Sequence, residues 1–196
     1  MATAVNLRPP SGITIGNAVG SVAEWLRRIT VRVGSRPSRG SGVVWTRGGL
    51  IVTNAHVASE GSHQVALWDG SALLAELVAR DSKMDLAALR LIGGRHQAAF
   101  PRSPKSMRPG EMVIAVGNPW DGSGAVSTGI LHHAIGKGPW LIADIRLAPG
   151  NSGGPLADVH GNVIGINSMV VNGFGCAVSS DVVSEFLRKA GLAERM

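Results

Sequence analysis

The chain has little of what marks secreted or membrane-spanning proteins. Its 196 residues contain a single cysteine, Cys176, so no disulfide can form within the chain. Small secreted β-proteins often depend on such bridges, and a lone cysteine favours a reducing compartment. The first residues are polar and contain prolines, unlike a signal peptide. No segment approaches the ~20 consecutive apolar residues of a membrane span. These absences predict a cytoplasmic protein that is not membrane-associated.

Signals of cofactor or metal binding are also missing. The chain has neither a G-x-G-x-x-G phosphate fingerprint nor a P-loop lysine. His132 and His133 would face opposite sides of a strand, so they cannot easily share a metal ion. The other candidate ligands, His63, His96 and His160, lie in turn-like contexts where solvated side chains are expected. Cys176 lies in an apolar run and is expected to pack rather than react. We therefore expect no cofactor and no metal.

The charge is strongly basic. There are 19 Lys and Arg residues against 13 Asp and Glu residues, and six arginines fall between Arg27 and Arg47. Such a surface could attract an acidic partner. No recognition helix or aromatic-rich single-strand motif accompanies the charge, so nucleic acid is not an expected partner. Plain solvated surface is the favoured interpretation, and an acidic partner is the alternative.

Abundant glycine and proline indicate the fold class. The 27 Gly and 10 Pro residues interrupt regular structure and suit short strands joined by turns. A helix is expected over 18–28, and a second helix is expected to start at an Asp181 N-cap and end at Gly191. Between them lie two sets of about six apolar, β-like runs separated by a linker at 93–110. The sequence predicts an all-β protein of two six-stranded barrels with a C-terminal helix. The expected strands are 30–33, 42–45, 50–53, 64–68, 72–79 and 86–91, then 112–116, 125–133, 140–144, 155–157, 163–171 and 175–178.

The corresponding domain division has four parts. Residues 1–12 form a flexible tail, 13–105 the first barrel, 106–180 the second barrel and 181–196 the terminal helix.

The run from Gly150 to Pro155 carries the clearest chemical signal, because glycines surround Ser152. A serine hydroxyl needs a base to become a nucleophile, and the oxyanion it creates needs donors already in place. Glycines let the backbone turn tightly enough to aim several N–H groups at one point. The run also fits the G-x-S-x-G elbow of α/β-hydrolases. That fold places its acid and histidine after the serine, whereas only His160 follows here, so the elbow match is judged coincidental.

A base and an acid precede this serine. His56 follows the apolar strand 50–53, and Asp85 directly precedes the strand 86–91. An aspartate in that place can be buried enough to hold the imidazole Nδ1–H and to fix its tautomer. The chain order His56, Asp85, Ser152 is the order of the chymotrypsin-type triad.

With these residues in place, the chain resembles the protease domain of the HtrA/Deg family of trypsin-like serine peptidases. The resemblance implies a chymotrypsin-like double barrel, with His56, Asp85 and Ser152 as the triad. It implies an oxyanion hole at Gly150, Asn151 and Ser152. It also implies a substrate-pairing strand at Asn167, Ser168, Met169 and Val170, with Gly175 in the facing wall of the specificity pocket. The stretches that carry it are 40–44, 50–57, 85–91, 108–119, 126–131, 144–156 and 163–168.

The chain also departs from the family. Members often carry a PDZ domain of about 80–100 residues after the protease domain, and too few residues follow the terminal helix here for one. Family trimers use aromatic residues near the N-terminus, yet none precedes Trp25, so a monomer or small homo-oligomer is expected. Arg146 replaces a small residue near the specificity pocket. Pointing inward, it would favour an acidic P1 side chain. Pointing outward or paired, the favoured arrangement, it leaves Leu147, Val170 and Gly175 to shape a pocket for small aliphatic side chains.

The resulting hypothesis is a serine endopeptidase that cleaves unfolded or extended protein segments through an acyl-enzyme. One alternative is a latent or non-catalytic, chaperone-like module of the same fold that needs a separate activating partner. Another is an esterase or acyl transferase using the same residues.

Overall fold

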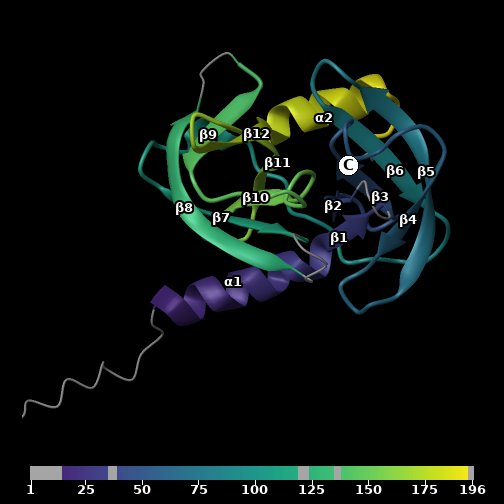
Figure 1. Cartoon of the computed structure of the whole chain (residues 1–196), viewed down its shortest axis with the longest axis horizontal. Helices are drawn as coiled ribbons and strands as arrows, with labels where there is room; N and C mark the ends of the chain where they lie inside the picture. The colour runs from purple at the N-terminus through teal and green to yellow at the C-terminus, as the bar shows by residue number, and fades with distance from the viewer. Residues whose placement is uncertain (1–14, 35–38, 119–123, 135–137, 194–196) are drawn as a thin grey trace, which may run out of the picture.

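Two closed barrels make up the body of the protein (Figure 1). A computed structural model of the chain describes residues 15–34, 39–118, 124–134 and 138–193. Within them, the strand order β1-β2-β3-β6-β5-β4 of the first barrel recurs in the second as β7-β8-β9-β12-β11-β10, with antiparallel pairing throughout. The first barrel comprises β1 (Thr30–Val33), β2 (Gly40–Val44), β3 (Leu50–Thr53), β4 (Ser62–Ala66), β5 (Ala72–Asp81) and β6 (Leu86–Leu91). The second comprises β7 (Met112–Gly117), β8 (Ala125–Ala134), β9 (Trp140–Asp144), β10 (Pro155–Asp158), β11 (Val163–Val171) and β12 (Phe174–Ser179).

Strand β3 shows why some strands are apolar without alternation. All four of its residues are buried, since successive side chains point to opposite faces and both faces are covered. Ile51 points into the first barrel, whereas Leu50 and Val52 join a different cluster that includes residues of the second barrel. By contrast, β4 lies away from the other barrel and alternates exposed and buried positions.

The largest apolar cluster therefore lies between the barrels. It joins Val52 and Leu86 of the first barrel to Ile114 and Ile166 of the second, all at most 1% exposed. Smaller clusters fill the interior of each barrel.

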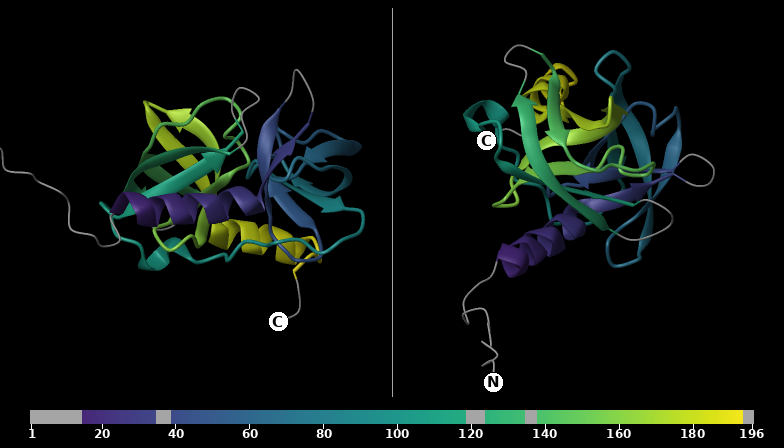
Figure 2. Two further views of the ribbon diagram at one scale, coloured as in Figure 1. Left: turned by 90° about the horizontal axis from the view of Figure 1, so that it is seen from below. Right: turned by 60° about the vertical axis from the view of Figure 1, so that its left-hand side comes forward.

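Two helices cover this contact between the barrels. Helix α1 (Ile15–Ile29) buries Leu26 and Ile29 and contacts β1 and β7. Helix α2 (Ser180–Lys189) contacts β11, β12 and β6, so each helix touches both barrels (Figures 1 and 2). Among the described residues, neither helix is long and apolar enough to cross a bilayer.

The double barrel with a C-terminal helix is confirmed, and five of the twelve predicted strands have the observed bounds. Helix α1 begins three residues before the predicted start at 18. The predicted N-cap of α2 was wrong: Ser179 caps the helix by accepting from the Val182 amide, while Asp181 lies in the first turn. The predicted end is confirmed, since Gly191 follows the helix at φ +70°, a conformation that favours glycine. The predicted tail 1–12 lies outside the described residues, and the division at 105/106 stays a prediction.

Packing between the barrels should dominate stability. Ile166→Ala is expected to lower the free energy of unfolding by about 2–4 kcal/mol, because Ile166 is fully buried and its removal leaves a cavity. Leu74→Ala, at a position 57% exposed on β5, should cost less than ~0.5 kcal/mol. Urea unfolding of both variants measures the difference, and equal losses would contradict this account.

Candidate active site

Ser152 lies in a loop that is clamped between the two barrels. Its carbonyl accepts a hydrogen bond from the Ser41 amide of β2 at 2.8 Å. The next residue, Gly153, donates its amide to the Asn167 carbonyl of β11, also at 2.8 Å. Gly153 has φ +85°, and a Cβ there would lie 2.0 Å from the Ser41 carbonyl oxygen. A Cβ on Gly154 would lie 2.1 Å from the Val116 carbonyl oxygen. Both positions therefore require glycine for the loop to approach the strands this closely.

His56 is presented by the first barrel on the turn that follows β3. The turn closes with the Val57 amide donating to the Asn54 carbonyl. The imidazole is half exposed, and its Nδ1 lies 2.9 Å from Oδ2 and 3.0 Å from Oδ1 of Asp85. The His56 backbone amide also donates to Asp85 Oδ1 at 3.1 Å. One carboxylate therefore fixes both the ring and the backbone of His56.

Asp85 is more buried than His56, with its side chain 17% exposed. It adopts φ +53°, a left-handed conformation that aspartate tolerates better than most residues. The Asn54 side-chain amide donates to the backbone carbonyl of Asp85 at 2.9 Å, and the Ser168 hydroxyl donates to Oδ2 of Asp85 at 2.5 Å. Asp85 is thus held from its own barrel by Asn54 and from the second barrel by Ser168.

The electrostatics of the pair favour an ionised carboxylate beside a basic imidazole. The hydrogen bond to Asp85 raises the pKa of His56 above its ordinary 6.5, against the opposing effect of burial. Burial acts to raise the pKa of Asp85, but hydrogen bonds from His56 and Ser168 outweigh it and the pKa lies below its usual value. Asp85 is therefore charged at neutral pH and can orient the Nδ1–H of His56.

The Ser152 hydroxyl is bonded to a different group. It donates to the Ser168 carbonyl at 3.0 Å, and within the described part of the chain it makes no hydrogen bond to His56. The structure therefore joins His56 and Asp85 directly, and Ser168 links Asp85 to Ser152.

The predicted oxyanion residues form a turn held by β2. The Gly150 carbonyl accepts from the Ser41 hydroxyl at 2.7 Å and from the Asn118 amide at 3.3 Å. Asn151 is buried and donates its amide to the Ala148 carbonyl at 3.0 Å. Among the described residues, the amides of Gly150 and Ser152 donate to no acceptor. They are the two amides that the resemblance assigns to the oxyanion.

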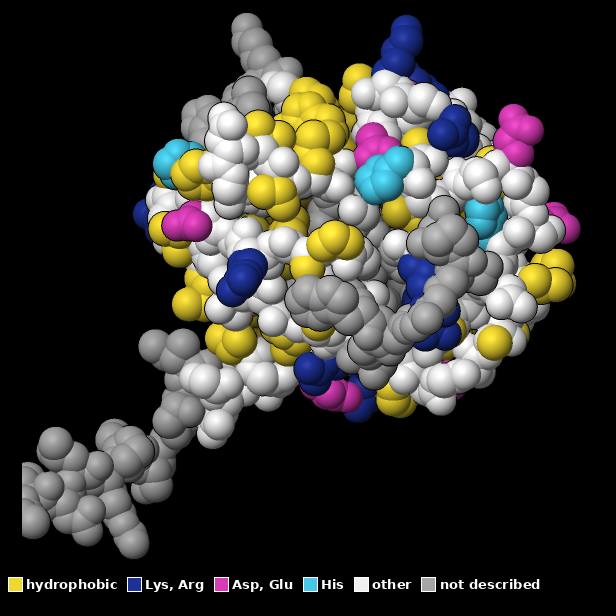
Figure 3. All heavy atoms as spheres, viewed as in Figure 1, with side chains coloured by type: hydrophobic (Ala, Val, Ile, Leu, Met, Phe, Trp, Pro, Cys, Tyr) yellow, Lys and Arg dark blue, Asp and Glu magenta, His cyan; other side chains and the backbone are white. Residues whose placement is uncertain are grey.

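An open cleft of about 410 Å³ adjoins Ser152. Figure 3, viewed from the same side as Figure 1, shows hydrophobic side chains gathered at the upper end of the second barrel. Met169 and Val170 are 42% and 51% exposed, whereas Asn167 is buried and donates to the Pro155 carbonyl. The lining residues are Leu147, Ala148, Pro149, Asn151, Ser152, Ser168, Met169 and Val170.

Three residues predicted to bind substrate, Arg146, Asn167 and Gly175, lie outside that lining. Gly175 lies behind Leu147, where a Cβ would come within 3.0 Å of the leucine side chain. Arg146 is exposed and has no ion-pair partner among the described residues.

Three residues that support the site were not predicted from the sequence: Ser41, Asn54 and Asn118. Ser41 and Asn118 help to hold the Gly150 turn, although each lies more than 30 positions away from it in sequence. Asn54 holds Asp85. The Gly40-Ser41-Gly42 run was a visible signal, since glycines flank a polar residue within a strand. The side chains of Asn54 and Asn118 gave no comparable signal.

The remaining histidines and the cysteine lie apart from this site. His63 was predicted to be solvated, which is wrong: it is buried, with Nε2 2.7 Å from the Ser59 carbonyl. His132 stacks on Phe174, and the side chain of His133 lies outside the described residues. Cys176 is buried, which raises the pKa of its thiol. In the described ranges, no group of three His, Cys, Asp or Glu side chains could hold a metal ion.

Comparison with known proteins identifies relatives of the HtrA/Deg type. A probable periplasmic serine endoprotease, DegP-like, from Brucella suis is 35% identical over 177 residues, covering 81% of this chain and 34% of the relative. The protein of the same name from Rhizobium meliloti is 37% identical over 170 residues, covering 77% and 34%. Serine protease HTRA1 of Xenopus tropicalis is 34% identical over 164 residues, covering 77% and 36%. The chain thus spans about a third of the length of these relatives.

The relatives correct one prediction. Several are named periplasmic, which points to the periplasm, so the cytoplasmic location predicted from the sequence is wrong. A low cysteine count does not separate the two compartments here, because two closed barrels and the cluster between them bury a core without disulfides.

The family itself follows from a match that covers most of the chain. Residues 40–166 match the trypsin-like peptidase domain, and this range contains Ser41, His56, Asp85 and Ser152. The matched range also runs from β2 of the first barrel into β11 of the second. The HtrA/Deg resemblance is confirmed by the relatives, and the chain belongs to the trypsin-like peptidase family.

Proposed function

We propose that the chain is a serine endopeptidase in which Ser152 is the nucleophile, His56 the general base and Asp85 the residue that orients the base. The observation that carries the proposal is the His56–Asp85 contact of 2.9 Å, which Ser168 links to the glycine-flanked Ser152. Membership of the trypsin-like family supports the same assignment. No cofactor is part of the proposed reaction.

The reaction begins with a rotation of the Ser152 hydroxyl from the Ser168 carbonyl toward His56 Nε2. As the hydroxyl oxygen attacks the scissile carbonyl carbon, its proton passes to Nε2, and Asp85 stabilises the imidazolium through Nδ1–H. The amides of Gly150 and Ser152 donate to the resulting oxyanion. His56 then gives the proton to the leaving amine, and a water molecule, deprotonated by His56, hydrolyses the acyl-enzyme.

Strand β11 offers a place for an extended substrate. It pairs with β10 no further than Ile166, so the edge of residues 168–170 that faces away from β12 has no partner strand among the described residues. An extended peptide can add to such an edge through backbone hydrogen bonds. A substrate amide that bonds to the Ser168 carbonyl would replace the Ser152 hydroxyl there and free it for attack.

The cleft favours small aliphatic P1 side chains. Its walls near Ser152 include Leu147, Met169 and Val170, which offer apolar contact. Because the exposed Arg146 is absent from the lining, an acidic P1 preference is the weaker alternative. Unfolded or extended protein segments are the proposed substrate class.

A latent module of the same fold is the second candidate. It is favoured by one observation, the bond from the Ser152 hydroxyl to the Ser168 carbonyl instead of His56. In that case a separate activating partner would have to redirect the hydroxyl. Labelling of Ser152 by a fluorophosphonate probe supports the enzyme, and absence of labelling with every substrate and partner tried supports the latent module.

Loss of the nucleophile is the direct test of the enzyme. Ser152→Ala should lower kcat on casein and on peptides with a P1 valine by about 10⁴-fold or more, without lowering the melting temperature. Ser62→Ala, at an exposed position on β4, is the matched control and should keep full activity. Undiminished cleavage by the Ser152 variant would remove Ser152 from the mechanism.

The pH profile should report the raised pKa of His56. His56 must be neutral to accept a proton, so kcat/KM should fall as the pH drops through its pKa. Because Asp85 raises that pKa, the midpoint should lie above 6.5. Asp85→Asn removes the cause, so the midpoint should move down while kcat falls by about 10⁴-fold. A wild-type midpoint below 6.5 would contradict the described contact.

Ser168 should act as a positioning residue. Ser168→Ala removes the hydroxyl that donates to Asp85, and should lower kcat about tenfold with little change in KM. A carboxylate with one donor fewer binds the imidazolium more strongly, so the acid limb of the pH profile should shift upward. Ser168→Thr keeps a hydroxyl and should restore most of the activity. An unchanged pH profile in Ser168→Ala would leave Ser168 with a structural role alone.

A further inference from the structure

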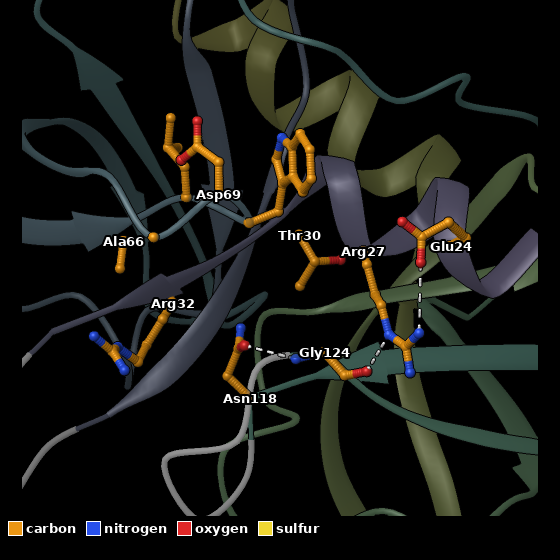
Figure 4. Close-up of a pocket in the computed structure, with 11 residues that line it drawn as sticks. Glu24, Arg27, Thr30, Arg32, Ala66, Asp69, Asn118 and Gly124 are labelled. Atoms are coloured by element: carbon orange, nitrogen blue, oxygen red, sulfur yellow. Dashed lines mark hydrogen bonds and ion pairs between the residues drawn. The ribbon is translucent and has the colours of Figure 1, made fainter.

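A second pocket, of about 490 Å³, lies apart from the catalytic cleft (Figure 4). It is bounded by the end of α1, by β1 and by the turn between β4 and β5. It shares no lining residue with the cleft beside Ser152. The residues that matter for its chemistry are Glu24, Arg27, Arg32, Trp68 and Asp69.

Most of the charged groups around this pocket already have partners. Arg27 donates Nε to the Gly124 carbonyl at 2.7 Å and lies 3.6 Å from Glu24. Arg28 lies 3.7 Å from the same carboxylate, with its guanidinium 5.3 Å from the ring centre of Trp68. Asp69 accepts hydrogen bonds from the amide and the hydroxyl of Ser71.

Arg32 is the exception. Its side chain is half-buried in the pocket wall, and among the described residues it has no hydrogen bond and no ion pair. In Figure 4 Arg27 carries dashed lines to its partners, whereas Arg32 carries none. A guanidinium presents several N–H donors in a planar arrangement that matches a carboxylate. Because Arg32 is partly buried, water competes less effectively with a carboxylate for these donors. The hydrogen-bonding groups of this pocket that are free to bind a ligand are therefore the N–H donors of Arg32.

We propose that this pocket binds an acidic segment of a polypeptide. One carboxylate pairs with Arg32, and an apolar side chain next to it in the segment packs on the indole of Trp68, which is 49% exposed. An aromatic ring with a guanidinium on one face offers its other face to such a side chain.

The distribution of charge favours a peptide over a nucleic acid. Arg32 is the one guanidinium of this pocket without a partner in the described residues, so the pocket suits a single carboxylate. The carboxylates of Glu24 and Asp69 stand at its edge and would repel a continuous run of phosphates.

The pocket lies one strand away from the nucleophile loop. Arg32 of β1 is directly opposite Ser41 of β2, whose amide donates to the Ser152 carbonyl. Neighbouring strands are about 4.8 Å apart, so the backbone of Arg32 lies one strand spacing from the residue that bonds the nucleophile loop. Binding requires no catalysis and does not rest on the proposed function.

The test measures binding to the full chain carrying Ser152→Ala, so that no probe is cleaved. The probes are a fluorescein-labelled peptide Ser-Ser-Glu-Phe-Ser and its amide counterpart Ser-Ser-Gln-Phe-Ser, titrated by fluorescence anisotropy. The acidic peptide should bind at least about tenfold more tightly, and Arg32→Gln should weaken it about tenfold. Arg90→Gln removes the same charge at an exposed position of β6 and should leave binding unchanged.

Further variants separate the alternatives. Arg32→Lys keeps the positive charge without the planar pair of donors, so this variant should bind the acidic peptide with intermediate affinity. It also provides the test if Arg32→Gln does not fold. The proposal is overturned if Arg32→Gln and Arg90→Gln bind alike, or if Arg146→Gln abolishes binding, since the peptide would then occupy the catalytic cleft. Tighter, Arg32-dependent binding of a fluorescein-labelled 20-nucleotide single strand would overturn it in favour of nucleic acid.

Discussion

Apolar packing between the two barrels is the constraint on which the rest of the structure depends. Strands β3 and β6 of the first barrel and β7 and β11 of the second bury side chains against each other, and both helices cover the same contact. The hydrophobic effect that buries this surface has no preferred direction, and its stabilising free energy grows with the apolar area removed from water. It sets the position of one barrel relative to the other, and hydrogen bonds such as Ser41 to Ser152 then fix the register locally.

The candidate site is a product of that contact. The first barrel supplies His56 and Asp85, and the second supplies Ser152 and Ser168. Ser168 joins them, because its hydroxyl donates to Asp85 and its carbonyl accepts from Ser152. Ser41 performs the reciprocal task, since it belongs to the first barrel yet holds the Ser152 and Gly150 carbonyls. The geometry of the site is therefore a property of the interface and not of either barrel alone.

Much of this could be predicted from the sequence, because strands and turns leave local signals. The apolar run 50–53 indicated the strand after which His56 lies, and the apolar run 86–91 indicated the strand before which Asp85 lies. What escaped prediction depends on contacts between distant residues, such as Ser41 with Gly150, or on features visible in three dimensions alone, such as Arg32 having no partner among the described residues. The cytoplasmic prediction was wrong because cysteine content reflects the need for bridges, and this core does not need them.

The two glycines after Ser152 have a consequence for how such a protein can diversify. A side chain at either position would collide with backbone of a neighbouring strand, in the first barrel at Gly153 and in the second at Gly154. A substitution at Gly153 would therefore push the loop away from the first barrel, and one at Gly154 would push it away from β7 of its own barrel. Leu147, Met169 and Val170 line the cleft with their side chains, so substrate preference can drift at these positions while the chemical centre stays constant.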